Sequence, residues 1–428
     1  MTNKIKLKNI KCWQSHIGDE AKLQRSLPLV LFIVIFGGVG MYFLLGSRAA
    51  SPFASITADN GTPANGATVT PDSTASDGNK VVFGGSSFSL STVFPIGVDQ
   101  QPTTNFATWK SRGVNTVLDV PQGNNQAAWD QAALQDGLYE MRSPSSNPAS
   151  DVGVKNLIAW DQPDEPDGIN SQVPYTTIQS NYTSWRAAWE AADPSTPPPP
   201  VYINFTSGLN QYNINNPSQN GPSWYEQYVA GADWITSDNY PVNEGDPLSI
   251  ITTEVNNLRA IAGGKPVFVF LETGAYDTSN KVITASQFNG EFWEAIIAGI
   301  RGIWYFPIQV TPTFSFDVTP AAVATQMTTD DATVTQLAPV LQGTVNPSSI
   351  GATVSSPLLV GWRSASSGNY FIVLNLSTNT ESNETIKLTG TGSATSATVY
   401  GENRTVPITN NTITDNFGPY AAHIYQIP

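Results

Sequence analysis

The stretch 159–167 reads AWDQPDEPD, and it has a counterpart later in the chain, where 266–274 reads PVFVFLETG. In both, an apolar run that is typical of a buried strand stops abruptly at carboxylate side chains. Strands that are buried on both faces of a parallel sheet show such unbroken apolar runs. The two stretches therefore predict buried strands, with Glu165 just beyond the end of one and Glu272 at the end of the other.

Outward from these stretches, strand-like and helix-like patterns alternate without a break. The expected strands are 94–99, 114–120, 138–142, 157–160, 201–205, 233–237, 267–271 and 302–307. The expected helices are 105–112, 126–135, 177–192, 224–230, 247–262, 285–299 and 320–341. The link 143–156 has no convincing helical pattern, so one connection is expected to lack its helix.

Helix-start signals support this division of the chain. Asp246-Pro247 and Thr319-Pro320 place a side-chain acceptor before a proline, and 284–287 fits a capping box. Eight strands that alternate with helices are what a (β/α)₈ barrel requires, and we predict this α/β fold over 93–343. A doubly wound sheet is the alternative, but no Gly-rich phosphate loop follows the first strand.

Different patterns flank the predicted barrel. Short alternating segments separated by Ser, Thr, Asn and Gly turns predict a small antiparallel β-sandwich over 350–428. Its expected strands are 358–362, 370–376, 384–388, 397–400 and 421–426. The segment 46–92 is rich in small polar residues with little apolar periodicity, which predicts a flexible linker.

The beginning of the chain predicts a membrane anchor. The segment 27–45 is almost entirely apolar and long enough to cross a bilayer as a helix, and the preceding tail, 1–26, is basic. This charge asymmetry predicts a single-pass protein with a cytoplasmic N-terminus and its main domain outside the cytoplasm. A cleaved signal peptide with small residues at Ala49 and Ala50 is the alternative, and it would make the protein secreted.

Composition removes several classes of function. The formal net charge of −14 argues against nucleic acid as a partner. The chain has one cysteine, Cys12, and two histidines, His16 and His423. The predicted barrel therefore holds no disulfide, Ser-His-Asp triad or His-ligated zinc site. A Mg²⁺ or Ca²⁺ site made of carboxylates stays open, although no segment has EF-hand spacing, and no cofactor is implied.

Barrel enzymes act at the C-terminal ends of their strands, so the polar and aromatic residues there are the candidate site. These candidates are Asp99, Arg142, Asp164, Glu165, Asn204, Tyr240, Glu272 and Trp304. A polar residue can also simply end a strand where the loop meets water, which is the favoured interpretation for Asp99 and Asn204. For Glu272 this interpretation is weak, because a buried carboxylate is costly without partners or a purpose.

Glutamates at the ends of the fourth and seventh strands resemble the clan A glycoside hydrolases, which are retaining enzymes on a (β/α)₈ barrel. The resemblance implies that Glu165 is the acid/base and Glu272 the nucleophile. It also implies that Tyr240 orients the nucleophile and that Trp304 forms the floor of the sugar site, with core packing as the alternative for both aromatic residues. Asp164 stands where the clan usually has a sugar-binding asparagine, and its charge is expected to raise the pKa of Glu165.

The sequence thus predicts a membrane-tethered retaining glycoside hydrolase that acts on a carbohydrate outside the cytoplasm. Double displacement requires the two carboxyl groups to lie about 5–5.5 Å apart. One alternative is a non-catalytic carbohydrate-binding protein on an inactivated barrel, because the usual asparagine is missing. Another is a metal-assisted hydrolase that uses Asp161, Asp164, Glu165 and Asp167 as ligands.

Overall fold

The computed structural model describes residues 67–71, 79–83, 88–168, 172–211 and 222–428. The chain divides into two compact units, Met1–Gly84 and Gly85–Pro428. In the first unit, β1 (Ala67–Pro71) pairs with β2 (Asn79–Phe83) in an antiparallel register. This pair interrupts the flexible linker expected over 46–92, and the valines and threonines within it have the β-branched side chains that favour strands.

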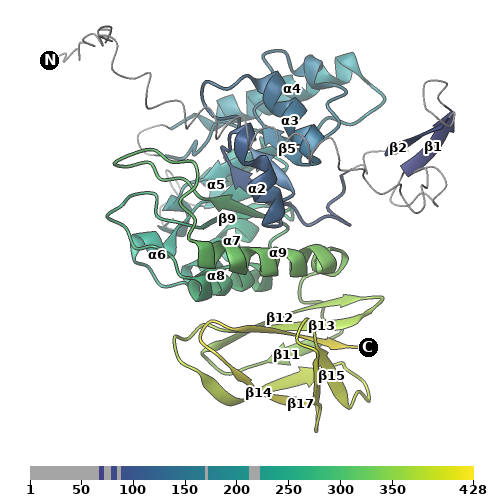
Figure 1. The fold of residues 1–428 in the computed structure, drawn as a ribbon, viewed down its shortest axis with the longest axis vertical. Helices are drawn as coiled ribbons and strands as arrows, with labels where there is room; N and C mark the ends of the chain where they lie inside the picture. Colours follow the sequence, from purple (N-terminus) through teal and green to yellow (C-terminus); the bar gives the residue numbers. More distant parts are fainter. Residues whose placement is uncertain (1–66, 72–78, 84–87, 169–171, 212–221) are drawn as a thin grey trace, which may run out of the picture. The chain divides into compact units, whose positions relative to one another are not determined.

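Eight parallel strands form the barrel of the second unit (Figure 1). They are β3 (Ile96–Asp99), β4 (Thr116–Leu118), β5 (Tyr139–Arg142), β6 (Leu157–Asp161), β7 (Val201–Phe205), β8 (Trp234–Ser237), β9 (Val269–Glu272) and β10 (Ile303–Phe306). Hydrogen bonds join them in the order β8-β7-β6-β5-β4-β3-β10-β9. Parallel bridges from Ile235 to Val267 and from Asp238 to Phe270 close the ring. Each strand lies at a range that the sequence predicts, and the doubly wound alternative is excluded.

Helices connect the strands around the outside of the barrel. They are α2 (Phe106–Ser111), α3 (Gln126–Asp136), α4 (Tyr175–Ala192), α5 (Pro222–Val229), α6 (Pro241–Glu244), α7 (Ile250–Ile261), α8 (Ala285–Ala298) and α9 (Ala321–Leu341). Short 3₁₀ turns add η2 (Thr103–Asn105), η3 (Pro148–Asp151) and η4 (Ser207–Gln211). Between β5 and β6 the chain forms only η3, as the missing helical pattern over 143–156 predicts.

One of the three expected helix starts is confirmed. Thr284 and Gln287 form a reciprocal capping box at α8. The other two predictions are wrong by a few residues. α7 begins only at Ile250, and α9 follows Pro320 without a side-chain cap. The Thr319 hydroxyl instead lies 2.8 Å from the Thr273 hydroxyl, so a tertiary hydrogen bond has replaced the local cap.

Two antiparallel sheets follow the barrel. One contains β11 (Gly351–Thr353), β14 (Glu381–Thr389) and β17 (Thr412–Phe417), and the other contains β12 (Leu358–Ala365), β13 (Gly368–Asn375), β18 (Ala422–Ile427), β15 (Ser396–Val399) and β16 (Arg404–Pro407). A common apolar core includes Phe371 of one sheet and Ile413 of the other, the arrangement expected of a sandwich. The sequence analysis missed β11, β16 and β17, which have few apolar positions.

The second of these sheets packs against α8 and α9 (Figure 1). The buried Arg363 of β12 donates a hydrogen bond of 2.9 Å from Nη2 to the backbone carbonyl of Ile296 in α8. Ile372 and Ile424 belong to the same apolar cluster as the residues between the barrel and its helices. The C-terminal sheets are therefore held against the barrel by apolar packing as well as by hydrogen bonds.

No helix among the described residues is long and apolar enough to cross a membrane. The predicted anchor at 27–45 lies outside the described residues.

The interior of the barrel makes Gly97 a sharp test of the fold. A Cβ atom added there would lie 2.2 Å from Leu118 Cδ1 and 2.5 Å from Trp304 Cε3, both inside the barrel. We expect Gly97→Ala to lower the free energy of unfolding by about 1–3 kcal/mol or more, because the packed side chains must shift. Gly418→Ala is the matched control, since its Cβ would meet only Ala421 Cβ at 3.8 Å. Equal stability of the two variants in thermal denaturation would contradict this packing.

Candidate active site

Three residues at the C-terminal ends of the barrel strands adopt the left-handed backbone conformation without being glycine. They are Gln100 with φ of 45°, Asp119 with φ of 51° and Glu165 with φ of 44°. Each such residue costs on the order of 1–2 kcal/mol relative to ordinary backbone. Strain of this kind concentrates at functional sites, where it holds side chains in place, so this end of the barrel is the candidate site.

Two hollows open at this end, and they share Asp164. The first, the aromatic hollow, has a volume of about 330 Å³ and is lined by Asp164, Glu165, Thr206, Ser207, Asp238, Tyr240, Glu244, Tyr276, Phe306 and Val310. The second, the polar hollow, has a volume of about 290 Å³ and is lined by Gln100, Asp119, Val120, Gln122, Ser143, Asp161, Gln162, Pro163, Asp164, Tyr202 and Asn204. Both are concave spaces with converging polar groups, as binding sites require.

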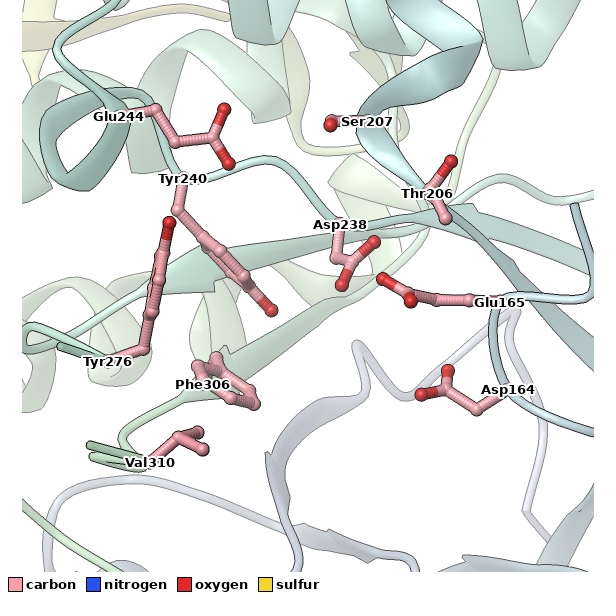
Figure 2. Close-up of a pocket in the computed structure, with 10 residues that line it drawn as sticks. All are labelled: Asp164, Glu165, Thr206, Ser207, Asp238, Tyr240, Glu244, Tyr276, Phe306 and Val310. Atoms are coloured by element: carbon pink, nitrogen blue, oxygen red, sulfur yellow. The ribbon is translucent and has the colours of Figure 1, made fainter. Parts of the chain in front are cut away.

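Two carboxyl groups face each other in the aromatic hollow, those of Glu165 and Asp238 (Figure 2). They are in hydrogen-bonding contact, so at least one of them carries a proton. Burial raises the pKa of Glu165, and the charge of Asp164 raises it further. Burial, together with the charge of Glu165, raises the pKa of Asp238 well above its usual range. The pair therefore retains one proton to a higher pH than an isolated carboxyl group does.

Asp164 separates the two hollows and is oriented from the polar side. Its Oδ1 accepts a hydrogen bond of 3.0 Å from Asn204 Nδ2. Part of the Asp164 side chain is open to solvent, yet the surrounding protein limits its hydration and raises its pKa. The expected increase in the pKa of Glu165 through Asp164 is thus present in this geometry, with burial as the larger cause.

Aromatic side chains form one wall of the aromatic hollow (Figure 2). Tyr240 stacks on Phe306 with ring centroids 5.1 Å apart and an interplanar angle of 26°, and Tyr276 lies 6.0 Å from Tyr240. Trp304, the expected floor of the sugar site, is fully buried inside the barrel and stacks on Phe268. Phe306, two residues further along β10, takes the place expected for Trp304, because only the last residue of the strand reaches the hollow.

Glu272 does not line either hollow. Its side chain is 1% exposed, and its oxygens accept hydrogen bonds of 2.6 Å from the Val242 amide and 2.9 Å from the Asn243 amide. It also contacts the buried carboxyl group of Glu291 on α8. Glu272 thus binds the segment that follows β8, which carries Asp238 and Tyr240, and this position differs from the one expected of a nucleophile.

Arg142 is also placed differently from its prediction as a residue of the site. Its guanidinium is 1% exposed and forms ion pairs of 3.1 Å with Asp130, 3.1 Å with Asp151 and 3.4 Å with Glu140. Asp151 lies in η3 and also accepts a hydrogen bond of 2.9 Å from the Trp160 indole. Arg142 therefore fixes the connection that lacks a helix, and it has no role in either hollow.

The remaining candidates, Asp99 and Asn204, lie close to the hollows. Asn204 lines the polar hollow, as does Asp119, which is not among the residues predicted from the sequence. Asp99 is 5% exposed, and the charges of Asp119 and Asp164 add to the effect of burial in raising its pKa. Asp238 is not among the residues predicted from the sequence, although its position directly after β8 is a signal that could have identified it.

The residues named as ligands in the metal-assisted alternative do not form a metal-binding group among the described residues. Asp167 accepts hydrogen bonds from the Thr206 amide, the Thr206 hydroxyl and the Tyr225 hydroxyl, so it holds the β6 and β7 loops together. No group of three or more His, Cys, Asp or Glu residues in the described part of the chain is arranged to hold a metal ion.

Comparison with known proteins extends the description of the fold. No family model matches the sequence, and no curated protein matches it. The α-amylase of Anoxybacillus superimposes with a TM-score of 0.51 at 7% identity, over 80% of this chain and 99% of that chain. The α-amylase of H. orenii has a TM-score of 0.46 at 9% identity, covering 79% and 100% of the two chains. A GH30 endoxylanase from Clostridium papyrosolvens C71 has a TM-score of 0.45 at 12% identity, covering 78% and 96%. Only the first similarity is close enough to carry an argument, and it shows a shared fold.

Buried glutamates without a basic partner continue behind the site, between β8, β9 and the outer helices. Glu254, Glu291 and Glu294 are fully buried, and Glu291 accepts no hydrogen bond from an N–H or hydroxyl donor. Burial raises the pKa of Glu254 to about 8, of Glu294 to about 7 and of Glu272 to about 8. The folded state therefore binds protons that the unfolded chain releases at lower pH.

This difference predicts a stability that decreases with rising pH. A raised folded pKa contributes stability that is complete below the unfolded value of about 4.3. That contribution is lost as the pH rises toward the folded values of about 7 to 8. We expect the midpoint temperature of thermal unfolding to decrease as the pH is raised from 5 to 8. The decrease should correspond to a loss of free energy of unfolding on the order of a few kcal/mol.

The variant Glu291→Gln should flatten this profile, because its amide stays neutral and donates a hydrogen bond to Glu272. Its gain over wild type should appear near pH 8 and be absent near pH 5. Glu226→Gln, at an exposed position of α5, is the control and should leave the slope unchanged. A wild-type midpoint that rises from pH 5 to pH 8 would contradict the proton-bound cluster.

Proposed function

We propose that this protein is a glycoside hydrolase that acts at the aromatic hollow. The observation that supports this proposal is the pair of facing carboxyl groups, Glu165 and Asp238, beside an aromatic wall at the C-terminal end of the barrel. Aromatic faces bind the apolar face of a sugar ring, and glycosidases use one protonated and one ionised carboxyl group. The shared fold with an α-amylase is consistent with this proposal.

Within this proposal Glu165 is the acid/base, as its position after the fourth strand suggested. Its side chain is half-buried and lines the hollow, as does that of Asp238, whose pKa burial raises well above its usual range. Transfer of the shared proton from Asp238 to Glu165 along their contact produces the two required forms. Rotation of the Glu165 side chain as a sugar enters would open the contact toward the about 5–5.5 Å separation of double displacement.

The reaction then has two steps. Asp238 attacks the anomeric carbon while Glu165 protonates the departing glycosidic oxygen, which forms a glycosyl ester on Asp238. Glu165, now ionised, takes a proton from water, and this water displaces Asp238 with overall retention of configuration. Glu272 would position the segment carrying Asp238 and Tyr240 through its bonds to the Val242 and Asn243 amides.

Variants of the two facing carboxyl groups test their roles. Glu165→Ala should lower kcat by about 10²–10⁴ for substrates with poor leaving groups, because proton donation is lost. Activated aryl glycosides should still form the ester, and azide should release it with retained configuration. Asp238→Ala should be inactive on all substrates, and azide should restore turnover with inverted configuration, because one displacement replaces two. Product stereochemistry by NMR provides the readout, and near wild-type rates in both variants would exclude this pair.

Glu272 provides a separate test, because the sequence analysis expected it to be the nucleophile. If it positions the loop, Glu272→Gln should lower kcat partly, and azide should have no effect on Glu272→Ala. An azide product of inverted configuration from Glu272→Ala would instead identify Glu272 as the nucleophile. Thermal denaturation of each variant controls for loss of folding.

We further propose that the chain is tethered to a membrane through 27–45, with the barrel outside the cytoplasm. Support comes from the apolar length of this segment and the basic residues before it. Protease added to intact cells should then release a soluble, active fragment that begins within 51–91. A membrane-free mature protein that begins after Ala50 would show that 27–45 is a cleaved signal.

A further inference from the structure

The mechanism proposed for the aromatic hollow leaves the polar hollow unused. Three side chains that line it have buried polar atoms without an N–H or hydroxyl partner: Oδ1 of Asn204, the hydroxyl of Tyr202 and the carboxylate oxygens of Asp161, whose polar neighbour is the carboxyl group of Asp119. These side chains are 5%, 4% and 3% exposed. Unpartnered polar atoms are rare in folded proteins, because each one costs free energy when it is removed from water. Three side chains with such atoms in one hollow indicate a site that binds a ligand.

The lining of the polar hollow is also acidic, with no basic residue among its described members to balance the charge. Asp119, Asp161 and Asp164 line it, and no Lys, Arg or His belongs to its described lining. Asp161 contacts the carboxyl group of Asp119, the charge of Asp99 acts on Asp161, and the charge of Asp119 acts on Asp99. Hydrogen-bond acceptors therefore outnumber donors in this hollow. A proton shared by Asp119 and Asp161 offsets part of the negative charge that no basic residue balances.

We infer that the polar hollow binds the ammonium group of an amino-sugar unit, so that the substrate is an unacetylated amino-sugar oligosaccharide. An ammonium group offers three donors and no acceptor, which complements the carboxylates of Asp119, Asp161 and Asp164. Asp164 belongs to both hollows, so the sugar held in the polar hollow neighbours the sugar that stacks in the aromatic hollow. This inference rests on the proposed function for the position of the bond that is cleaved, although binding itself does not require cleavage.

Amine binding has a signature that binding of a neutral sugar lacks. Burial raises the pKa of Asp119 to about 6 and that of Asp161 well above its usual range, so this pair of carboxyl groups retains a proton at pH values where an isolated aspartate is ionised. An ammonium group stabilises the ionised carboxylates and therefore expels a proton as it binds. A hydroxyl or an acetamido group in the same position leaves that proton in place.

Isothermal titration calorimetry on the full chain in detergent tests this with three probes that differ only at C2: D-glucosamine, D-glucose and N-acetyl-D-glucosamine. The measurement is repeated near pH 6 to 7 in two buffers of different ionisation enthalpy. We expect D-glucosamine to bind at least about tenfold more tightly than the other two, as a charge-assisted hydrogen bond provides. It alone should show a buffer-dependent enthalpy, which reports proton release.

Asp161→Asn and Asp119→Asn should each remove this preference, bringing the affinity for D-glucosamine to within about threefold of that for D-glucose. The second variant protects against misfolding of the first, because asparagine tolerates the left-handed backbone at 119. Asp246→Asn is the matched control. It removes one negative charge at an exposed position that lines neither hollow, and the preference should persist.

Equal binding of the three probes, or a preference that survives in both hollow variants, would overturn the inference. So would stabilisation of the wild type by Ca²⁺ that depends on Asp161 while D-glucosamine has no effect, because the hollow would then be a metal site. The same titrations on Glu165→Gln, which lacks the proposed acid/base, measure amine binding when cleavage is removed. They therefore separate this inference from the proposed function. Amine binding without any hydrolysis by the wild type refutes the glycosidase function alone, and hydrolysis without amine preference refutes only this inference.

Discussion

Closure of the parallel sheet is the constraint on which the rest of the structure depends. β8 and β9 meet through the bridges from Ile235 to Val267 and from Asp238 to Phe270, and these complete the ring that six intervening strands begin. All strands run in one direction, so their C-terminal ends come together at one end of the barrel. Asp99, Asp119, Glu165 and Asp238, which are far apart in the sequence, become neighbours for this reason alone.

This arrangement places several buried carboxyl groups close together, and protonation reduces the repulsion between them. Neither hollow has a basic residue in its described lining, and the glutamates behind the site also lack basic partners. Isolated buried carboxylates would cost far more than the fold can supply, so the groups stay protonated and share protons in pairs. The same arrangement favours chemistry that transfers protons and lowers stability as the pH rises. Function and pH dependence of folding thus have one physical origin.

Strain contributes to the same end of the barrel. Gln100, Asp119 and Glu165 adopt a left-handed backbone conformation that glycine adopts more easily. All three line a hollow. Packing elsewhere must maintain these conformations. Glu272 has a comparable supporting role, because its bonds to the Val242 and Asn243 amides hold α6, the short helix that follows Asp238 and Tyr240. The aromatic hollow therefore depends on residues that do not face it.

The order of strands and helices, the missing helix over 143–156 and Glu165 in the hollow could all be predicted from local patterns. Strand and helix periodicities are written in the chain, and parallel strands must end together. The orientation of Glu272 could not, because its backbone partners lie in the loop after a different strand. The ion pairs that occupy Arg142 were equally out of reach. For Trp304 the sequence left both a sugar-binding floor and core packing open, and the structure shows core packing. The sequence by itself determined which residues end the strands. Tertiary structure alone decided which of those side chains face a hollow and which are already bound by the protein, since that choice depends on contacts between elements distant in the chain.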